Sequence, residues 1–280
     1  MRRFQKIYVE ISNVCNLRCS FCPGTRRKRQ VMTKSEFASL LPKLQPWTDF
    51  LYFHIMGEPL CHPQLAEFLS LAGQFGCKVI LTTNGTLLAK QQETLMQATA
   101  LHKVNISLHA FEANDLDIPF SEYLRQCFAF GQAAQGQKLV VYRLWNQGGA
   151  EERNAEILSA IETVFPKPWN VQRRGTKIGN RIFLEYGEKF DWPDLAAQEG
   201  GEQVFCYGLR DQIGILCDGT VVPCCLDHEG DLALGNLFSD SLEQILATPR
   251  AQAIYQGFGR RKAAEELCRK CGYARRFEKH

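Results

Sequence analysis

Short apolar runs alternate with longer amphipathic stretches from Lys6 to about Val171. The apolar runs predict buried strands at Ile7–Ile11, Phe50–Met56, Lys78–Thr83, Val104–Leu108 and Lys138–Leu144, with a further one near Asn170–Gln172. The amphipathic stretches predict helices at about Lys34–Leu44, Pro63–Gly76, Leu87–Leu101, Phe120–Gln135 and Glu151–Phe165. Such alternation requires parallel strands joined by helical crossovers. About six of these units predict an α/β fold, a partial (β/α)6 barrel with its active site at the carboxyl ends of the strands.

The chain changes character after this region. Ile213–Cys217 and Thr220–Cys224 flank Asp218-Gly219, which signals a two-residue hairpin because glycine accepts the positive φ of such a turn. A short helix is expected over Ser241–Leu246, with Pro249 limiting its length, and a final helix is expected to run into Cys268.

Three parts are therefore expected. Residues 1–175 form the barrel, residues 176–204 form a connecting segment that lacks periodicity, and residues 205–280 form a small cysteine-rich α+β domain.

Twelve cysteines stand out in a chain of 280 residues with a net charge of +3. The basic segment Met1–Gln5 is not followed by an apolar signal segment, and no apolar stretch approaches the ~20 residues that span a bilayer. We therefore expect a cytoplasmic protein without a membrane partner, and the near-neutral charge makes nucleic acid an unlikely partner. In a reducing compartment, cysteines that cluster at both ends of a chain indicate metal binding rather than disulfides.

The first cluster is Cys15-x-x-x-Cys19-x-x-Cys22, directly after the first predicted strand. Thiolates are soft ligands that suit iron–sulfur clusters or zinc. A structural zinc site needs four ligands, and this segment supplies three, so zinc would require a distant fourth ligand. A [4Fe–4S] cluster with three protein ligands leaves one iron open for a substrate or cofactor.

The segment Cys-Asn-Leu-Arg-Cys-Ser-Phe-Cys, with Phe21 before its third cysteine, resembles the signature loop of the radical S-adenosylmethionine enzymes. The resemblance implies a cluster on Cys15, Cys19 and Cys22 whose open iron is chelated by S-adenosylmethionine. It also implies reductive cleavage to a 5′-deoxyadenosyl radical that abstracts a hydrogen atom from the substrate. An electron donor such as flavodoxin or ferredoxin is implied as a partner.

Other predicted strand ends agree with this resemblance. Met56-Gly57-Glu58-Pro59 is similar to the family's Gly-Gly-Glu-Pro motif, which holds the amino group of the cofactor, although Met56 replaces the first glycine. The resemblance extends to further positions that imply contacts with the cofactor: Thr83, Asn84, Ser107 and Arg143. Each of these also has a plain interpretation, as a turn or capping residue or, for Arg143, as the partner of a surface acid.

The second cluster resembles the twitch form of the SPASM extension that follows many radical S-adenosylmethionine barrels. The matching positions are Cys206, Cys224, Cys268 and Cys271, and they imply one auxiliary [4Fe–4S] cluster. Cys217 and Cys225 are additional, and Cys225 could replace Cys224, because adjacent residues at a strand end point to opposite sides. A four-cysteine structural zinc ribbon is the alternative interpretation.

The remaining candidates have weaker signals. Cys61 is a candidate hydrogen donor, or a small buried residue like Cys77 and Cys127. His54 and His109 lie on or just after predicted strands and are candidate acid–base groups inside the barrel. The basic runs Arg26–Arg29 and Arg260–Lys262 are expected to be solvated faces that guide an anionic substrate or a reductase.

Two activities compete within the family. The first is a two-electron oxidation assisted by the auxiliary cluster, because the cysteine layout resembles that of the twitch-type dehydrogenase acting on a deoxy-scyllo-inosamine alcohol. The second is modification of a peptide or protein side chain, so the substrate is a small molecule or a peptide. A third interpretation, of another class, is a non-catalytic zinc or iron–sulfur binding protein.

Overall fold

A computed structural model describes residues 4–149, 152–173, 175–198 and 200–277 of the chain. Its strands form one sheet with the order β11-β10-β9-β1-β2-β3-β4-β5-β8-β7-β6. The strands are β1 (Lys6–Val9), β2 (Phe50–Phe53), β3 (Lys78–Thr83), β4 (Leu101–Ser107), β5 (Leu139–Gln147), β6 (Asn170–Gln172), β7 (Gly175–Gly179), β8 (Ile182–Glu188), β9 (Gln212–Ile215), β10 (Thr220–Val222) and β11 (Gly235–Asn236).

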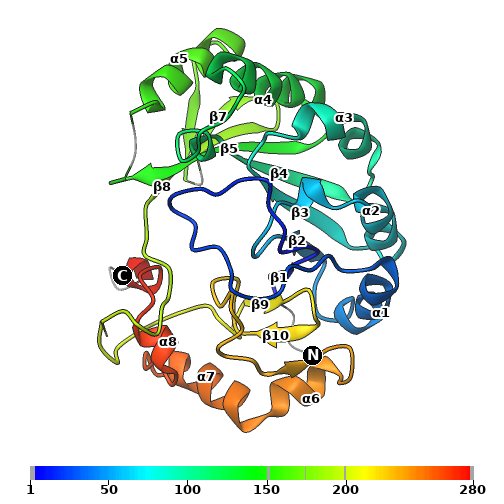
Figure 1. Cartoon of the computed structure of the whole chain (residues 1–280), viewed down its shortest axis with the longest axis vertical. Helices are drawn as coiled ribbons and strands as arrows, with labels where there is room; N and C mark the ends of the chain where they lie inside the picture. The colour runs from blue at the N-terminus through cyan, green and yellow to red at the C-terminus, as the bar shows by residue number, and fades with distance from the viewer. Residues whose placement is uncertain (1–3, 150–151, 174, 199, 278–280) are drawn as a thin grey trace.

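The strands β1, β2, β3, β4, β5 and β8 are parallel neighbours, and they curve around a central space (Figure 1). The helices that connect them lie on the outer side of this curve (Figure 1). These helices are α1 (Lys34–Leu44), α2 (Leu65–Gln74), α3 (Leu88–Gln97), α4 (Phe120–Ala134) and α5 (Asn154–Val164). The predicted α/β partial barrel is confirmed, while Glu151, the expected first residue of the fifth helix, lies outside the described residues.

The two faces of the sheet differ in polarity. Outward side chains pack on the helices, as Phe53 does on Phe37 of α1, with ring centroids 5.5 Å apart. Inward positions hold polar and aromatic side chains besides apolar ones such as Ile80 and Val141, and the register places Tyr8 beside Tyr52 and Arg143 beside Glu185 on this inner face. Successive strand residues point to opposite faces of the sheet, so the outer face can be apolar while the inner face presents polar side chains for chemistry.

The sixth parallel strand differs from the prediction. Asn170–Gln172 is β6, an exposed edge strand antiparallel to β7, and the sixth parallel strand is Ile182–Glu188. The expectation of an irregular connection over this part of the chain is therefore wrong. The reason is that β8 alternates buried apolar residues, Ile182 and Leu184, with a charged interior residue, Glu185, which weakens the apolar signal of the strand.

The cysteine-rich region continues the barrel sheet. Strand β9 pairs in parallel with β1, and β10 returns antiparallel to β9, which confirms a hairpin at this position. Its turn is longer than the predicted two residues, because Leu216 N donates to Thr220 O and leaves Cys217, Asp218 and Gly219 between the strands. Figure 1 shows α6 (Leu242–Ala247), α7 (Pro249–Gly259) and α8 (Glu266–Arg269) packed beside this hairpin. Pro249 does more than limit the preceding helix, because it occupies the first turn of α7, where a residue without an N–H is tolerated. The short 3₁₀ helices are η1 (Pro59–Cys61), η2 (Leu108–Ala110) and η3 (Ala274–Phe277).

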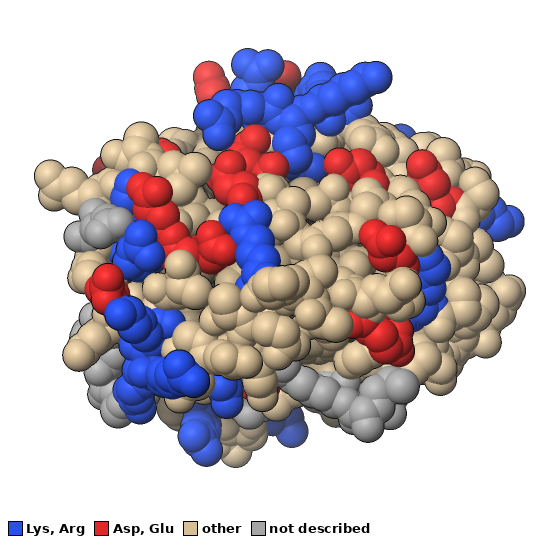
Figure 2. Space-filling model, turned by 90° about the horizontal axis from the view of Figure 1, so that it is seen from below, with Lys and Arg blue, Asp and Glu red and all other residues tan. Residues whose placement is uncertain are grey.

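Charged side chains of both signs are mixed over the face seen in Figure 2. None of the helices in the described ranges combines the length and apolarity that a bilayer crossing demands.

Candidate cofactor and cluster sites at the strand ends

Cys15, Cys19 and Cys22 lie on the loop that follows β1. Two N–H groups donate to sulfurs of this loop: Leu17 N to Cys15 Sγ (3.4 Å) and Asn114 Nδ2 to Cys19 Sγ (3.1 Å). A backbone hydrogen bond from Cys22 N to Cys19 O (3.0 Å) closes the turn between the last two cysteines. Burial raises the pKa of all three thiols, that of Cys19 to about 11. Thiols that stay protonated on their own need a bound metal centre to become thiolates, and N–H donors aimed at sulfur favour that charged form.

Across the described ranges, no three His, Cys, Asp or Glu side chains are placed to share one metal ion. A [4Fe–4S] cluster takes its thiolates on separate iron atoms, so it does not require the sulfurs to converge on one ion.

Gly57 packs directly against this cysteine loop. Its φ is +77°, and an added Cβ would lie 2.3 Å from Ser12 O and 2.9 Å from Val14 O. Met56 does not need to be glycine, since it is not among the described residues whose backbone has a positive φ. Its N–H donates to Glu10 Oε2 (3.2 Å) and its sulfur lies 4.0 Å from Cys22 Sγ. The replacement of the first motif glycine by methionine is therefore accommodated without strain.

Glu58 ties the ends of β2 and β3 together. Its side chain is buried and accepts hydrogen bonds from Asn84 N (2.8 Å) and Leu60 N (3.0 Å), and burial raises its pKa to about 7. Thr83 is also buried, and its hydroxyl accepts from Gly85 N (3.1 Å), as expected of a turn residue. A nearby cation would favour the ionised carboxylate of Glu58, so this position suits an ammonium ligand.

A polar network links this end of the sheet to the cysteine loop. Asn84 Nδ2 donates to Asn16 Oδ1 (2.9 Å), and Asn16 Nδ2 donates to Thr86 Oγ1 (2.8 Å). The ends of β1, β2 and β3 thus meet at one edge, as the rule for parallel sheets predicts.

A second group of predicted residues surrounds a pocket at the ends of β4 and β5. The rings of Phe21 and His109 are 5.0 Å apart, and both line a pocket with about 460 Å³ of empty volume, part of it open to solvent. Trp145, Asn146 and Lys189 also line it. His109 Nδ1 lies 3.1 Å from Arg143 O, and burial lowers the pKa of His109 to about 4. His109 is therefore neutral and joins η2 to β5.

Arg143 and His54 lie deeper, on the inner face of the barrel. Arg143 Nε is 3.3 Å from Glu185 Oε2, and its guanidinium lies 4.5 Å from the centroid of the Trp145 ring. Arg143 therefore forms an ion pair with an acid, as the alternative interpretation expected, although this acid lies on the inner face of the neighbouring strand and is 22% exposed. His54 packs edge-on against Tyr8, at 5.0 Å between centroids.

The other predicted residues take subsidiary places. Ser107 is on the inner face beside Arg143, and its carbonyl accepts a hydrogen bond from Tyr123 (3.4 Å). Pro59 begins η1, and Cys61 ends it with a half-buried thiol whose pKa is raised by burial. Cys77 and Cys127 are buried in the core.

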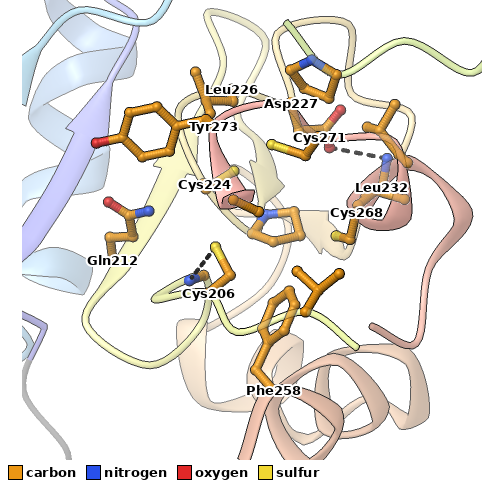
Figure 3. Close-up of a pocket in the computed structure, with 16 residues that line it drawn as sticks. Cys206, Gln212, Cys224, Leu226, Asp227, Leu232, Phe258, Cys268, Cys271 and Tyr273 are labelled. Atoms are coloured by element: carbon orange, nitrogen blue, oxygen red, sulfur yellow. Dashed lines mark hydrogen bonds between the residues drawn. The ribbon is translucent and has the colours of Figure 1, made fainter. Parts of the chain in front are cut away.

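The four cysteines of the second group converge on one pocket. Cys206, Cys224, Cys268 and Cys271 all line a pocket with about 510 Å³ of empty volume, part of it open to solvent. Figure 3 shows them reaching it from separate segments: the loop before β9, the end of β10, and α8 with the turn after it. Gly208 N donates to Cys206 Sγ (3.4 Å). Burial raises the pKa of all four thiols, so they too need a metal centre to ionise.

The additional cysteines point elsewhere. Cys225 packs beside Tyr8 on the barrel side, and the Cys217 thiol donates to Glu10 O (3.0 Å). Neither lines the pocket that holds the other four sulfurs. The two adjacent residues in the turn after β10 thus face opposite sides, with Cys224 in the pocket and Cys225 in the barrel.

This division predicts different outcomes for two neighbouring substitutions. If Cys224 is a ligand of one of two [4Fe–4S] clusters, we expect Cys224→Ala to lose about half of the bound iron. Cys225→Ala should keep its iron, since this side chain contacts Tyr8 instead. Iron analysis and the visible spectrum of anaerobically purified protein measure both. Equal iron loss in the two variants would contradict this assignment.

Two residues that matter for the site, Arg27 and Glu10, were not predicted. Arg27 belongs to a run expected to be solvated, yet its Nη2 lies 2.8 and 2.7 Å from the two carboxylate oxygens of buried Glu10. Its Nε donates to His228 O (2.7 Å), so this pair joins the cysteine loop to the C-terminal region. The available signal was Glu10 itself, because a charged residue in a buried strand needs a partner.

Comparisons with known proteins agree with this layout. Residues 9–127 match the family model described as Radical SAM superfamily, and residues 206–272 match the SPASM model, described as an iron-sulfur cluster-binding domain.

Two curated relatives match part of the chain. GTP 3′,8-cyclase of Chlorobaculum tepidum is 30% identical over 118 residues, which are 40% of this chain and 34% of the relative. S-adenosyl-L-methionine-dependent 2-deoxy-scyllo-inosamine dehydrogenase of Niallia circulans is 28% identical over 115 residues, 38% of this chain and 46% of the relative. The chain thus spans a third to a half of the length of these relatives.

Among solved structures, the fold is similar to BtrN in complex with AdoMet and 2-DOIA, with a TM-score of 0.63 and 19% identity. That similarity covers 97% of this chain and 94% of the other, so it includes both the barrel and the cysteine-rich region.

Proposed function

Because this chain belongs to the radical S-adenosylmethionine superfamily and carries a SPASM-type iron–sulfur domain, we propose that it oxidises a small polar substrate by two electrons. The cofactors of this enzyme class are S-adenosylmethionine and [4Fe–4S] clusters. When bound, these groups supply a carbon radical that removes a hydrogen atom from the substrate and an acceptor for the second electron.

The residues at the strand ends have matching roles in this proposal. Cys15, Cys19 and Cys22 would hold the first cluster, and Glu58 would accept the amino group of S-adenosylmethionine. Asn84 and Ser107 offer hydrogen-bonding groups for its ribose, and the aromatic wall formed by Phe21 offers a face for its base. Cys206, Cys224, Cys268 and Cys271 would hold the auxiliary cluster.

One observation carries the choice of an oxidation: the auxiliary pocket adjoins the barrel interior. Tyr273 and Gln212 line the pocket, and Figure 3 shows both on the side nearest the barrel strands. Tyr273 is also within electrostatic range of Arg143 and Tyr8 on the inner face. Cys224 faces the pocket while its neighbour Cys225 contacts Tyr8. An electron acceptor bound there would lie beside the substrate.

The dehydrogenase of Niallia circulans supports the same reaction class, since it is named for an oxidation and is 28% identical to this chain over 115 residues. Modification of a peptide and cyclisation of a nucleotide are the competing reactions, and the test below separates them.

We further propose that a flavodoxin or ferredoxin donates the electron at the cysteine loop. Cys22 is exposed there, and Arg18, Lys28 and Arg29 are exposed on the same or the adjoining segment. Basic side chains suit an acidic redox protein, whose association would then weaken with increasing salt.

The proposed oxidation is tested with anaerobically reconstituted protein, S-adenosylmethionine and dithionite. We expect release of 5′-deoxyadenosine, and with a deuterated substrate from a cyclitol and sugar-acid panel, transfer of deuterium into it. The product should have lost one pair of hydrogen atoms. An isomeric or cyclised product, or turnover with peptides only, would refute the oxidation, and absence of 5′-deoxyadenosine would refute the radical mechanism.

A further inference from the structure

The inner face of the barrel carries an excess of positive charge. Glu185 on β8 is shared by two cations: Arg143 Nε lies 3.3 Å from its Oε2, and Lys103 Nζ lies 3.7 Å from its Oε1. The three side chains are between 16 and 22% exposed. Burial lowers the pKa of both Lys103 and Arg143, with Glu185 opposing this effect in each case. One carboxylate therefore offsets only one of two poorly solvated cations.

Glu58 does not correct this imbalance. Among the described residues it is the buried acid at the end of β2, and its carboxylate already accepts hydrogen bonds from Asn84 N and Leu60 N. Glu10, at the end of β1, is paired with Arg27. His54 adds no charge of either sign, because burial and the nearby Arg143 cation lower its pKa to about 3.

The same inner face holds polar atoms without partners. His54 Nδ1, Asn105 Oδ1 and Trp145 Nε1 are buried and have no hydrogen-bond partner. They lie at inward positions of, or just after, β2, β4 and β5, the side of the sheet opposite the helices. Buried donors and acceptors are normally satisfied, so unpaired ones that face one space indicate a polar ligand.

Trp145 connects these groups to open space. Its ring lies under the Arg143 guanidinium, at 4.5 Å, and it also lines the 460 Å³ pocket beside Phe21 and Lys189. A ligand in this pocket therefore contacts Trp145, the side chain that packs on Arg143.

We propose that the barrel interior binds an anionic group of the substrate, a carboxylate or a phosphate, through Arg143 and Lys103, with the Trp145 indole N–H as a further donor. The planar guanidinium of Arg143 suits both anions. Glu185 then holds the two cations in place before binding and partly neutralises them. His54 and Asn105 would receive hydroxyl or amide groups of the same molecule. This inference rests on the proposed function, since it concerns the substrate of that reaction.

The proposal also excludes a substrate class. An amine placed beside Arg143 and Lys103 would meet like charges in a poorly solvated space, which is unfavourable. The interior therefore selects acidic substrates over amino-substituted ones.

The test measures binding of simple anions to the holoenzyme. Inorganic phosphate, malonate, neutral myo-inositol and the amine putrescine are titrated by calorimetry at constant ionic strength, with S-adenosylmethionine at saturation. We expect phosphate or malonate to bind and the neutral and amine probes not to bind. Comparison of the two anions shows whether the group is a phosphate or a carboxylate.

Three variants give the binding a location. Arg143→Gln should weaken anion binding at least tenfold, whereas Glu185→Gln should tighten it, because the competing carboxylate is removed. Arg125→Gln, in an exposed ion pair with Glu122 on α4, should leave it unchanged. If Arg143→Gln fails to fold, the tightening by Glu185→Gln still decides the matter, since a damaged protein would not bind more strongly.

Several results would overturn the proposal. These are no anion binding, binding unaffected by Glu185→Gln, preference for the amine, or competition between the anion and S-adenosylmethionine, which would assign Arg143 to the cofactor carboxylate. The two proposals fail separately: anion binding without 5′-deoxyadenosine release refutes the proposed function, and the converse refutes only the anion site.

Discussion

We expect the Cys19→Ala variant to release no 5′-deoxyadenosine above the reagent background. Three thiolates are the full protein contribution to an open-cornered cluster, so the loss of one removes the site at which S-adenosylmethionine is cleaved. The cluster chemistry has no substitute among side chains, and the expected loss is therefore at least ~1000-fold, comparable to removing a catalytic group. Anaerobic assay of 5′-deoxyadenosine by chromatography and mass spectrometry measures it, together with iron content.

A matched cysteine serves as the control. Cys77 is buried between α2 and the amino end of β3, at the opposite edge of the sheet from the cysteine loop, and Cys77→Ala should keep both the iron and the 5′-deoxyadenosine release. Retained activity in Cys19→Ala would refute the assignment of this loop as the cofactor site. Bound zinc in place of iron in the unsubstituted protein would favour the structural zinc interpretation.

The second large effect is expected on stability, from Arg27→Met. Glu10 is fully buried, and its carboxylate is held by Arg27 with help from Met56 N (3.2 Å) and Cys217 N (3.3 Å). Removing one partner of a buried ion pair leaves an uncompensated charge, which costs about 3–5 kcal/mol of the free energy of unfolding. Urea unfolding of anaerobically prepared protein, followed by circular dichroism, gives this value.

Its neighbour provides the comparison. Arg26 pairs with Glu229 at 3.7 Å, but its side chain is 86% exposed, so Arg26→Met should change the free energy of unfolding by no more than about 1 kcal/mol. Adding Glu10→Gln to Arg27→Met should recover part of the loss, because the unpaired charge is then removed. If the two arginine variants were equally mild, the buried pair would not hold the cysteine loop to the C-terminal region.

Much of the barrel follows from local patterns. The helix Lys34–Leu44 was predicted to the residue, because Thr33 and Glu36 form a capping box that the structure contains. The strand Lys78–Thr83 was likewise correct, since an apolar run bounded by glycines leaves little choice of register. The cysteine spacing located the first cluster loop for a similar reason, because Cys15, Cys19 and Cys22 lie close together in the sequence and need no distant partner to be recognised.

Other features depended on distant partners. Strand β8 was missed because its inward residue, Glu185, is charged and becomes acceptable only beside Arg143 and Lys103 from other strands. Arg27 looked like one basic residue among several, and only Glu10 separates it from its exposed neighbours.

Local spacing by itself determined the strand–helix alternation, the cysteine loop and the family resemblance, because each depends on residues within a few positions of one another. Only the tertiary structure decided that Cys224 enters the auxiliary pocket while Cys225 faces Tyr8, and that Arg143 lies against Glu185 inside the barrel. Side-chain direction at a strand end follows from how the sheet curves and what packs on each face, and segments far apart in the chain supply both.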